Sequence, residues 1–318
     1  MVEVYVGDFP KWMPRIFSGL SFIFNSFLIH IICHQNKSRI SRTYRSLLIS
    51  FCIFDICYSA SDLMTGMNRK VAEIAFLVRC SFIGLSYGIL ELHFIYRYII
   101  LCRPSMTKLF SKFYILLMFF FISINGFFFG AAAWVIFDIE ETKEFIRDDF
   151  YQNYHADVSQ VVMVTLHYRA REASTLMRTY LSLLLTNISS VAAVATYFIL
   201  GTKIVQYLRR SSISAAARAL HRQLFTALVV QSSIPFVVSL LPCLVTWFTP
   251  LFGVSIGRFN NYYTIPMFSA FPCCDPIAIA FIVAEYRRYI YGLIPRPRKE
   301  LHKIASSSNH VFTLQIIL

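Results

Sequence analysis

Two acids and one amide lie inside long uncharged stretches of this chain, where a polar side chain needs a partner. Asp275 lies within FPCCDPIAIAFIV, ten residues before Glu285, and Pro276 follows it directly. Asp55 lies ten residues, and Asn25 eleven, from the polar end of its own stretch. At 1.5 Å per helical residue, all three lie at one depth, about 15 Å from those ends. A lone carboxylate at that depth in a membrane costs about 2.5–3.5 kcal/mol, so the three side chains are expected to form one polar cluster.

The composition indicates that these stretches are surrounded by lipid. Hydrophobic residues make up 57% of the chain and charged residues only 15%, with a mean hydropathy of +0.57. Soluble domains carry about 25% charged residues, so an ordinary soluble enzyme is excluded. The net charge of +13 would suit a nucleic-acid partner, but the Lys and Arg residues form short clusters between uncharged runs. No nucleic acid is therefore expected as a partner.

Seven segments are long and apolar enough to cross a membrane as helices. A helix needs about 20 apolar residues to cross a hydrocarbon layer of roughly 30 Å. The expected spans are 16–33, 46–67, 80–101, 112–138, 178–203, 222–258 and 262–284. The predicted fold is an all-α membrane protein, a seven-transmembrane helix bundle over residues 12–285. A short extracellular N-terminus at 1–11 precedes it, and a cytoplasmic tail at 286–318 follows.

The charges of the loops set the predicted orientation. The short loops at 34–45, 102–112 and 203–222 carry several Lys and Arg residues and no acid, whereas the loop at 138–178 carries eight acids. Because short cytoplasmic loops are rich in Lys and Arg, the N-terminus is expected outside and the C-terminus inside. The loop at 138–178 contains no cysteine, so something other than a disulfide must hold it. No CxxC pair or Cys/His cluster predicts a metal, and no cofactor is expected.

Four segments, in order, resemble a known receptor family. They are SRTYRSLLISFCIFDICYS, HFIYRYIILCRP, RQLFTALVVQSSIP and FPCCDPIAIAFIVAEYRR. They are similar to nematode seven-transmembrane chemoreceptors of the Str group, relatives of the olfactory diacetyl receptor, within the G protein-coupled receptor superfamily. The resemblance implies a receptor, not an enzyme, that detects a small volatile or soluble chemical in the plasma membrane of sensory cilia. It also implies signalling through a heterotrimeric G protein.

The resemblance gives roles to two groups of polar residues. Asn25, Asp55, Asp275 and Pro276 resemble the network of the first, second and seventh helices that rearranges on activation of rhodopsin-like receptors. A static interhelical hydrogen-bond cluster is the alternative. The second group is the expected G-protein contact. Tyr96, Arg97 and Tyr98 belong to FIYRY, which stands in the place of the Asp-Arg-Tyr motif, and the basic residues Arg218 and Arg222 lie at the rim of this contact.

Arg97, in this second group, has no partner in the resting state that the sequence identifies. Tyr96 replaces the acid that would bind the arginine by a charge-assisted hydrogen bond, so its resting partner is open. A snorkelling arginine that anchors the helix end is the alternative interpretation.

Four aromatic residues and one methionine, in the outer halves of the third, sixth and seventh spans, are candidates for ligand binding. They are Tyr87, Trp247, Tyr262, Tyr263 and Met267. An aromatic site with few charges suits small uncharged molecules. Aromatic residues at this depth also form interfacial belts, which is the alternative.

The tail segment EYRRYIYGLI is expected to form an amphipathic helix on the membrane surface, in contact with anionic lipid. Its lipid-facing residues are predicted to be Tyr286, Tyr289, Ile290 and Leu293. Two other functions stay open at this stage. A transporter would often show internal repeats, none of which is evident. A seven-span ligand-gated channel would have its N-terminus inside.

Overall fold

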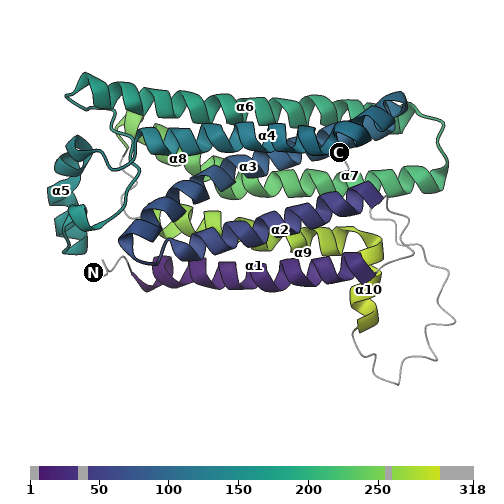
Figure 1. Cartoon of the computed structure of the whole chain (residues 1–318), viewed down its shortest axis with the longest axis horizontal. Helices are drawn as coiled ribbons and strands as arrows, with labels where there is room; N and C mark the ends of the chain where they lie inside the picture. The colour runs from purple at the N-terminus through teal and green to yellow at the C-terminus, as the bar shows by residue number, and fades with distance from the viewer. Residues whose placement is uncertain (1–6, 35–41, 255–259, 294–318) are drawn as a thin grey trace.

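The computed structural model describes residues 7–34, 42–254 and 260–293. Within these residues the regular structure is helical, apart from one isolated bridge between Phe137 and Val164. Figure 1 shows long helices side by side along one axis, with α5 at one end and α10 at the other.

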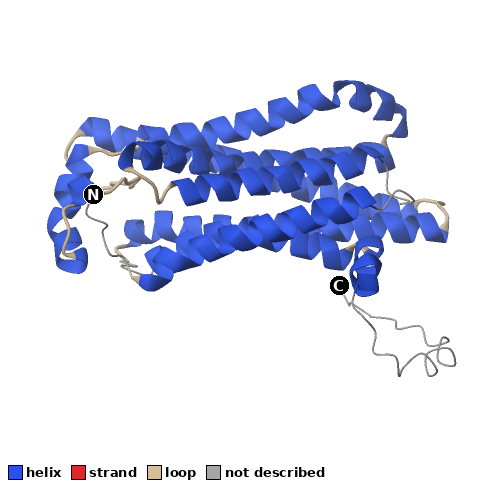
Figure 2. Ribbon diagram, turned by 60° about the horizontal axis from the view of Figure 1, so that its bottom comes forward, coloured by secondary structure: helices blue, strands red, loops and turns tan. Residues whose placement is uncertain are grey.

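The long helices correspond to the seven predicted spans. They are α1 (Asp8–His34), α2 (Arg42–Met64), α3 (Arg69–Cys102), α4 (Thr107–Val135), α6 (Ala173–Arg210), α7 (Ala215–Pro235) continued by α8 (Leu241–Phe248), and α9 (Ile265–Ile282). Among the described residues, six helices meet the length and hydropathy needed to cross a membrane, and α4 contributes the shorter apolar segment Phe119–Val135. The predicted seven-transmembrane bundle is therefore confirmed, and Figure 2 shows it from a second side.

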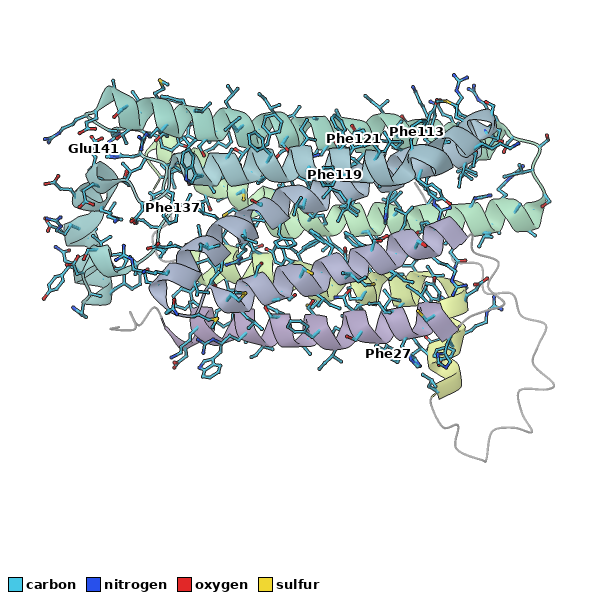
Figure 3. All side chains as sticks on the ribbon, viewed as in Figure 1. Phe27, Phe113, Phe119, Phe121, Phe137 and Glu141 are labelled. Atoms are coloured by element: carbon cyan, nitrogen blue, oxygen red, sulfur yellow. The ribbon has the colours of Figure 1, made fainter. Side chains whose placement is uncertain are left out.

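The surface of the bundle is apolar, as a helix bundle in lipid requires. Phe119 on α4 is 70% exposed and Phe27 on α1 is 40% exposed, and both are labelled in Figure 3. Without a partner chain or lipid these side chains would contact water, so lipid is the solvent that stabilises the fold.

Glycines allow α3 and α4 to pack closely. Gly84 and Gly88 on α3 lie four residues apart, as do Gly126 and Gly130 on α4. A methyl group at Gly84 or Gly88 would overlap a backbone carbonyl of α4. This is the small-xxx-small pattern by which membrane helices associate, since the apolar tails of lipids leave van der Waals packing as the main attraction.

The same segment, GLSYG at 84–88, also matches the G-x-S-x-G pattern of hydrolase nucleophiles. In those enzymes the serine lies on a sharp turn between a strand and a helix. Here Ser86 lies in the middle of α3, is buried, and donates a 2.6 Å hydrogen bond to the Ile83 carbonyl. The glycines therefore serve helix packing.

Helix α3 begins eleven residues before the predicted span, which started at Cys80. Arg79, which directly precedes the predicted span, is buried inside the bundle. Its Nε lies 3.0 Å from a carboxylate oxygen of Asp62 on α2. Because the charge is paired, the helix continues through it.

The outer loop is held by ion pairs and hydrogen bonds. The carboxylate of Asp138 lies 2.7 Å from the buried Lys143 of α5 (Glu140–Tyr154) and 3.7 Å from Arg69 of α3. The Asp138 amide donates to the Met163 carbonyl beside the isolated bridge. Asp138 thus joins three separate parts of the outer end.

Glu141 ties the far side of this loop to the start of α6. Its carboxylate accepts hydrogen bonds from the backbone amides of Arg171 and Glu172, at 2.6 and 3.1 Å. The Thr175 hydroxyl and these amides lower the pKa of the Glu141 carboxyl. Figure 3 shows Glu141 and Phe137 at the outer end of the molecule. The loop is thus anchored to α3, α5 and α6 by its own polar groups.

The tail helix α10 (Ala284–Leu293) lies where the sequence predicts one, but one lipid-facing assignment is wrong. Tyr286 is 1% exposed and packs in a core cluster with Tyr44 and Val283, because α10 folds back against the inner end of the bundle. Tyr289 and Ile290 pack at the edge of the same cluster, and Leu293 is exposed. Residues 294–318 lie outside the described part of the chain.

Candidate functional site

The three predicted polar residues are brought to one region by α1, α2 and α9. Asn25, Asp55 and Asp275 are each at most 1% exposed, and the two carboxyl groups are close enough to interact electrostatically. Among the described residues, no hydrogen-bond partner is found for either carboxyl group or for the side-chain oxygen of Asn25. The three helices thus bring two carboxyl groups and one amide side chain together in the middle of the bundle.

Prolines of α9 create the hydrogen-bond acceptors for its neighbours. Pro276 lacks an N–H, so the Pro272 carbonyl one turn earlier has no helical partner. The Asn25 amide donates to that carbonyl at 2.9 Å, and Ser21 donates to it at 3.3 Å. This assigns Pro276 a definite part in the cluster, because it frees the carbonyl that α1 binds.

Pro272 does the same one turn further out. Its missing N–H frees the Phe268 carbonyl, to which the Tyr58 hydroxyl of α2 donates at 3.1 Å. Side chains of α1 and α2 therefore satisfy both carbonyls that the prolines of α9 free.

A buried ion pair that sequence reasoning missed lies in the outer half. Asp62 of α2 binds Arg79 of α3, and it accepts a 3.2 Å hydrogen bond from Ser18 of α1. Arg79 also donates to Ser269 of α9 at 3.3 Å. Four helices meet at this pair. Its signal in the sequence was the opposite charges of Asp62 and Arg79 at the outer limits of consecutive spans.

Arg97 has an aromatic partner in place of an acid. Its guanidinium carbon lies 3.9 Å from the centre of the Tyr44 ring on α2, and the side chain is 3% exposed. Tyr44 in turn stacks on Tyr96, with ring centres 6.3 Å apart. A buried cation over an aromatic face is stabilised by about 2 kcal/mol. The acid missing from FIYRY is thus replaced by a cation–π contact across two helices.

A large cavity lies between α6 and α7, with α3 at its inner wall. Its volume is about 1170 Å³. Tyr87, Ser190 and Leu240 line one end, and Arg209, Arg218 and Arg222 line the other.

Comparisons with known proteins agree with this geometry. The family model of the serpentine type seven-transmembrane G protein-coupled chemoreceptor Srj matches residues 4–78 and 66–290. The chain belongs to the Srj family of serpentine receptors. It is 26% identical to serpentine receptor class J-38 of Caenorhabditis elegans over 88% of this chain and 91% of that protein. It is 22% identical to serpentine receptor class r-10 of the same nematode, over 86% and 88%.

A solved structure supports the same fold. The Srj chain superposes on squid rhodopsin with a TM-score of 0.56 over 97% of this chain and 87% of that one, at 11% identity. The resemblance to nematode serpentine chemoreceptors is therefore confirmed. This Srj protein is a multi-pass membrane protein of the G protein-coupled receptor superfamily, and its relatives are receptors.

The predicted ligand-binding residues of the Srj receptor occupy different places. Tyr87 is buried and lines the cavity between α6 and α7. Tyr262 and Tyr263 are 41% and 37% exposed, and Tyr262 stacks on Phe9 of α1. Trp247 accepts a 2.5 Å hydrogen bond from Tyr168 of the outer loop through its carbonyl, and Met267 is half-buried on α9. The Trp247 contact joins the loop to α8, and burial raises the pKa of Tyr168 to about 12.

The predicted G-protein residues fall into two groups in this Srj fold. Tyr96 and Arg97 face α2 through Tyr44, and His221 of α7 lies near enough to interact with the charge of Arg97. Arg218 and Arg222 line the cavity mouth, and the ring of Tyr98 faces Lys203 of α6. Arg97 thus lies between α2 and α7 at the inner end of the bundle.

A second buried polar contact completes the middle of the Srj bundle. Glu91 of α3 accepts a 2.9 Å hydrogen bond from the Asn125 amide of α4, and Ser189 of α6 donates to the Asn125 oxygen at 2.5 Å. Glu91 thus connects α3 to α4 and, through Asn125, to α6.

Proposed function

We propose that this Srj receptor binds a small uncharged chemical from outside the cell and, in response, activates a heterotrimeric G protein at its inner face. The observation that carries the proposal is the buried Arg97. A cationic side chain at the inner end of α3, held by an aromatic ring instead of an acid, can be released when neighbouring helices move.

The proposed ligand site extends from the outer ends of α8 and α9, with the turn before α9, to the middle of α3. Its proposed ligand contacts are Tyr87, Trp247, Tyr262, Tyr263 and Met267. The Asp62–Arg79 ion pair on α2 and α3 lies beside this site. Because this pair is already neutralised, the region favours uncharged ligands. Ligand binding would favour a state in which α9 and α7 shift, since both contain prolines and α9 is bound to α1 through the Pro272 carbonyl.

Activation passes through the polar cluster to the inner end. Asn25, Asp55 and Asp275 lie between the outer site and Arg97, and Pro276 frees the carbonyl that joins α9 to α1. The receptor is proposed to function in the plasma membrane of sensory neuron cilia, which are exposed to external chemicals.

Expression in cultured cells with a chosen Gα subunit tests the proposal. A panel of volatile and water-soluble chemicals should include at least one that produces a calcium or cAMP response, absent from cells without the receptor. Removing the G protein should abolish that response. A ligand-gated current that persists without any G protein would instead establish the channel function.

A further inference from the structure

The cavity between α6 and α7 has an apolar wall and a basic mouth. Its apolar wall includes Phe198 and Val205 of α6 and Val229 of α7, and Phe198 and Val229 are exposed at the surface of the bundle. At the inner end the wall gives way to three exposed arginines, Arg209, Arg218 and Arg222. The cavity is therefore amphipathic along the membrane normal.

This cavity is long enough to span the inner half of a bilayer. Phe236, another lining residue, lies 14 residues beyond Arg222 and directly follows α7. At 1.5 Å per residue this is about 21 Å, whereas one half of the hydrocarbon layer is about 15 Å thick. A chain that starts at the arginines can therefore extend through the inner leaflet beside apolar side chains.

The charge of the mouth is uncompensated. No acid occurs between Glu172 and Asp275, so α6 and α7 carry none. Among the described ion pairs none involves the three arginines, and Arg218 donates a hydrogen bond to the Ser211 carbonyl. Arginine binds phosphate oxygens in pairs through its planar guanidinium, and basic pockets between membrane helices on the cytoplasmic side suit phospholipid headgroups.

We propose that this cavity binds one anionic phospholipid of the inner leaflet. Its phosphate contacts Arg209, Arg218 and Arg222, and one acyl chain lies along Phe198, Val205 and Val229. The lipid joins α6 to α7 and stabilises the separation that the two helices have here. This binding requires neither the chemical ligand nor the G protein, so it stands apart from the proposed function.

Lipid titration followed by native mass spectrometry tests the proposal. Purified full-length receptor in phosphatidylcholine mixed micelles receives increasing phosphatidylinositol 4,5-bisphosphate, and the number bound and the Kd are measured. We expect one tightly held lipid per receptor. Arg209→Gln, Arg218→Gln and Arg222→Gln should each weaken binding about fivefold, and the triple variant on the order of 100-fold.

Two matched controls separate this site from general surface charge and bulk. Lys203→Gln with Arg210→Gln removes two exposed charges from the same end of α6 that do not line the cavity, and it should leave the Kd within about twofold. Val229→Trp, with all charges kept, should weaken binding about tenfold, as excluding roughly two methylene groups does. Val191→Trp adds the same bulk on the exposed face of α6 outside the cavity and should have no effect.

A soluble headgroup and a neutral lipid test whether the cavity binds the whole phospholipid or only one part of it. Inositol trisphosphate and diacylglycerol should each bind at least about tenfold more weakly than the whole lipid, because each lacks one half of the contact. Equal binding by either would contradict the proposal, as would wild-type lipid affinity in the triple variant. A triple variant that keeps the lipid but loses a Gα carboxy-terminal peptide would assign the arginines to the G protein instead. The single variants, each changing one exposed side chain, keep the test decisive if the triple variant does not fold.

Discussion

At the scale of single residues, Arg97 shows how a receptor can hold its inner arginine without the usual acid. The centre of the Tyr44 ring lies 3.9 Å from the guanidinium carbon, and Tyr96, which replaces the acid in FIYRY, stacks on the same ring. The sequence identified Arg97 and the missing partner. It could not identify Tyr44, because that residue is 53 positions earlier and meets Arg97 only through the packing of α2 on α3.

Replacing Tyr44 with Leu should raise ligand-independent signalling. A cation–π contact of about 2 kcal/mol that holds the resting state corresponds to roughly a 30-fold change in the resting equilibrium. Tyr44→Phe keeps the aromatic face and should behave as the wild type. Basal nucleotide exchange in membranes, normalised to receptor amount, measures both variants. Equal basal rates for Tyr44→Leu and wild type would show that the contact does not hold the resting state.

Replacing Asp55 or Asp275 with Asn should alter signalling with little change in surface expression. Each substitution keeps the size of the side chain and removes one ionisable group from a buried pair that has no cation among the described residues. Dose–response curves with an identified ligand, compared at equal surface density, measure the effect. Wild-type curves for both variants would leave the cluster only the static structural role.

At the scale of elements, the helix bundle depends on contacts whose sequence signals differ in strength. The seven spans follow from uncharged runs, because length and hydropathy determine whether a helix can cross a membrane. The depth of Asn25, Asp55 and Asp275 follows from helix rise alone. The outer start of α3 was missed because Arg79 is paired inside the bundle, and pairing cannot be read from one chain position. The four glycines of α3 and α4 were a readable signal that hydropathy does not reveal.

Replacing Gly88 with Ala should destabilise the packing of α3 on α4. The new methyl group would overlap the Phe121 carbonyl, which is backbone and cannot move freely, so we expect a loss of about 1–3 kcal/mol. Gly201→Ala on α6 is the matched control, because its methyl group would meet Phe94 at an ordinary 3.6 Å. Thermal unfolding in detergent compares the two. A control variant that loses as much stability as Gly88→Ala would argue against the glycine contact.

Replacing Asp138 with Asn should loosen the outer loop. Lys143, which is 6% exposed, would lose its 2.7 Å partner, and Arg69 would lose its contact with the loop. Hydrogen exchange over residues 138–157 should then speed up at least about tenfold, as loss of a buried charge contact allows local opening. Glu144→Gln, at an exposed position of α5 with no described ion pair, serves as control. Unchanged exchange in Asp138→Asn would mean that other contacts hold the loop.

At the scale of the whole molecule, the Srj fold places the proposed outer ligand region, a central polar cluster and an inner arginine along one bundle. The class of protein and its seven helices could be predicted because composition, charge and helix length are properties of the chain itself. The partners of its functional residues could not, because Tyr44, Arg79 and Asn125 reach Arg97, Asp62 and Glu91 only across helices. The ligand contacts are the least determined by sequence, since aromatic residues at helix ends suit a binding site and a lipid interface equally.

The most direct test of the account is nucleotide exchange by purified receptor reconstituted with a heterotrimeric G protein. Arg97→Ala should abolish ligand-stimulated exchange and leave ligand binding unchanged, because Arg97 is buried at the inner end of α3, far from the outer halves of the helices. Arg210→Ala removes an exposed arginine from the same end of the bundle and should exchange nucleotide as the wild type does. Wild-type exchange rates in an Arg97→Ala receptor that still binds ligand would contradict the account.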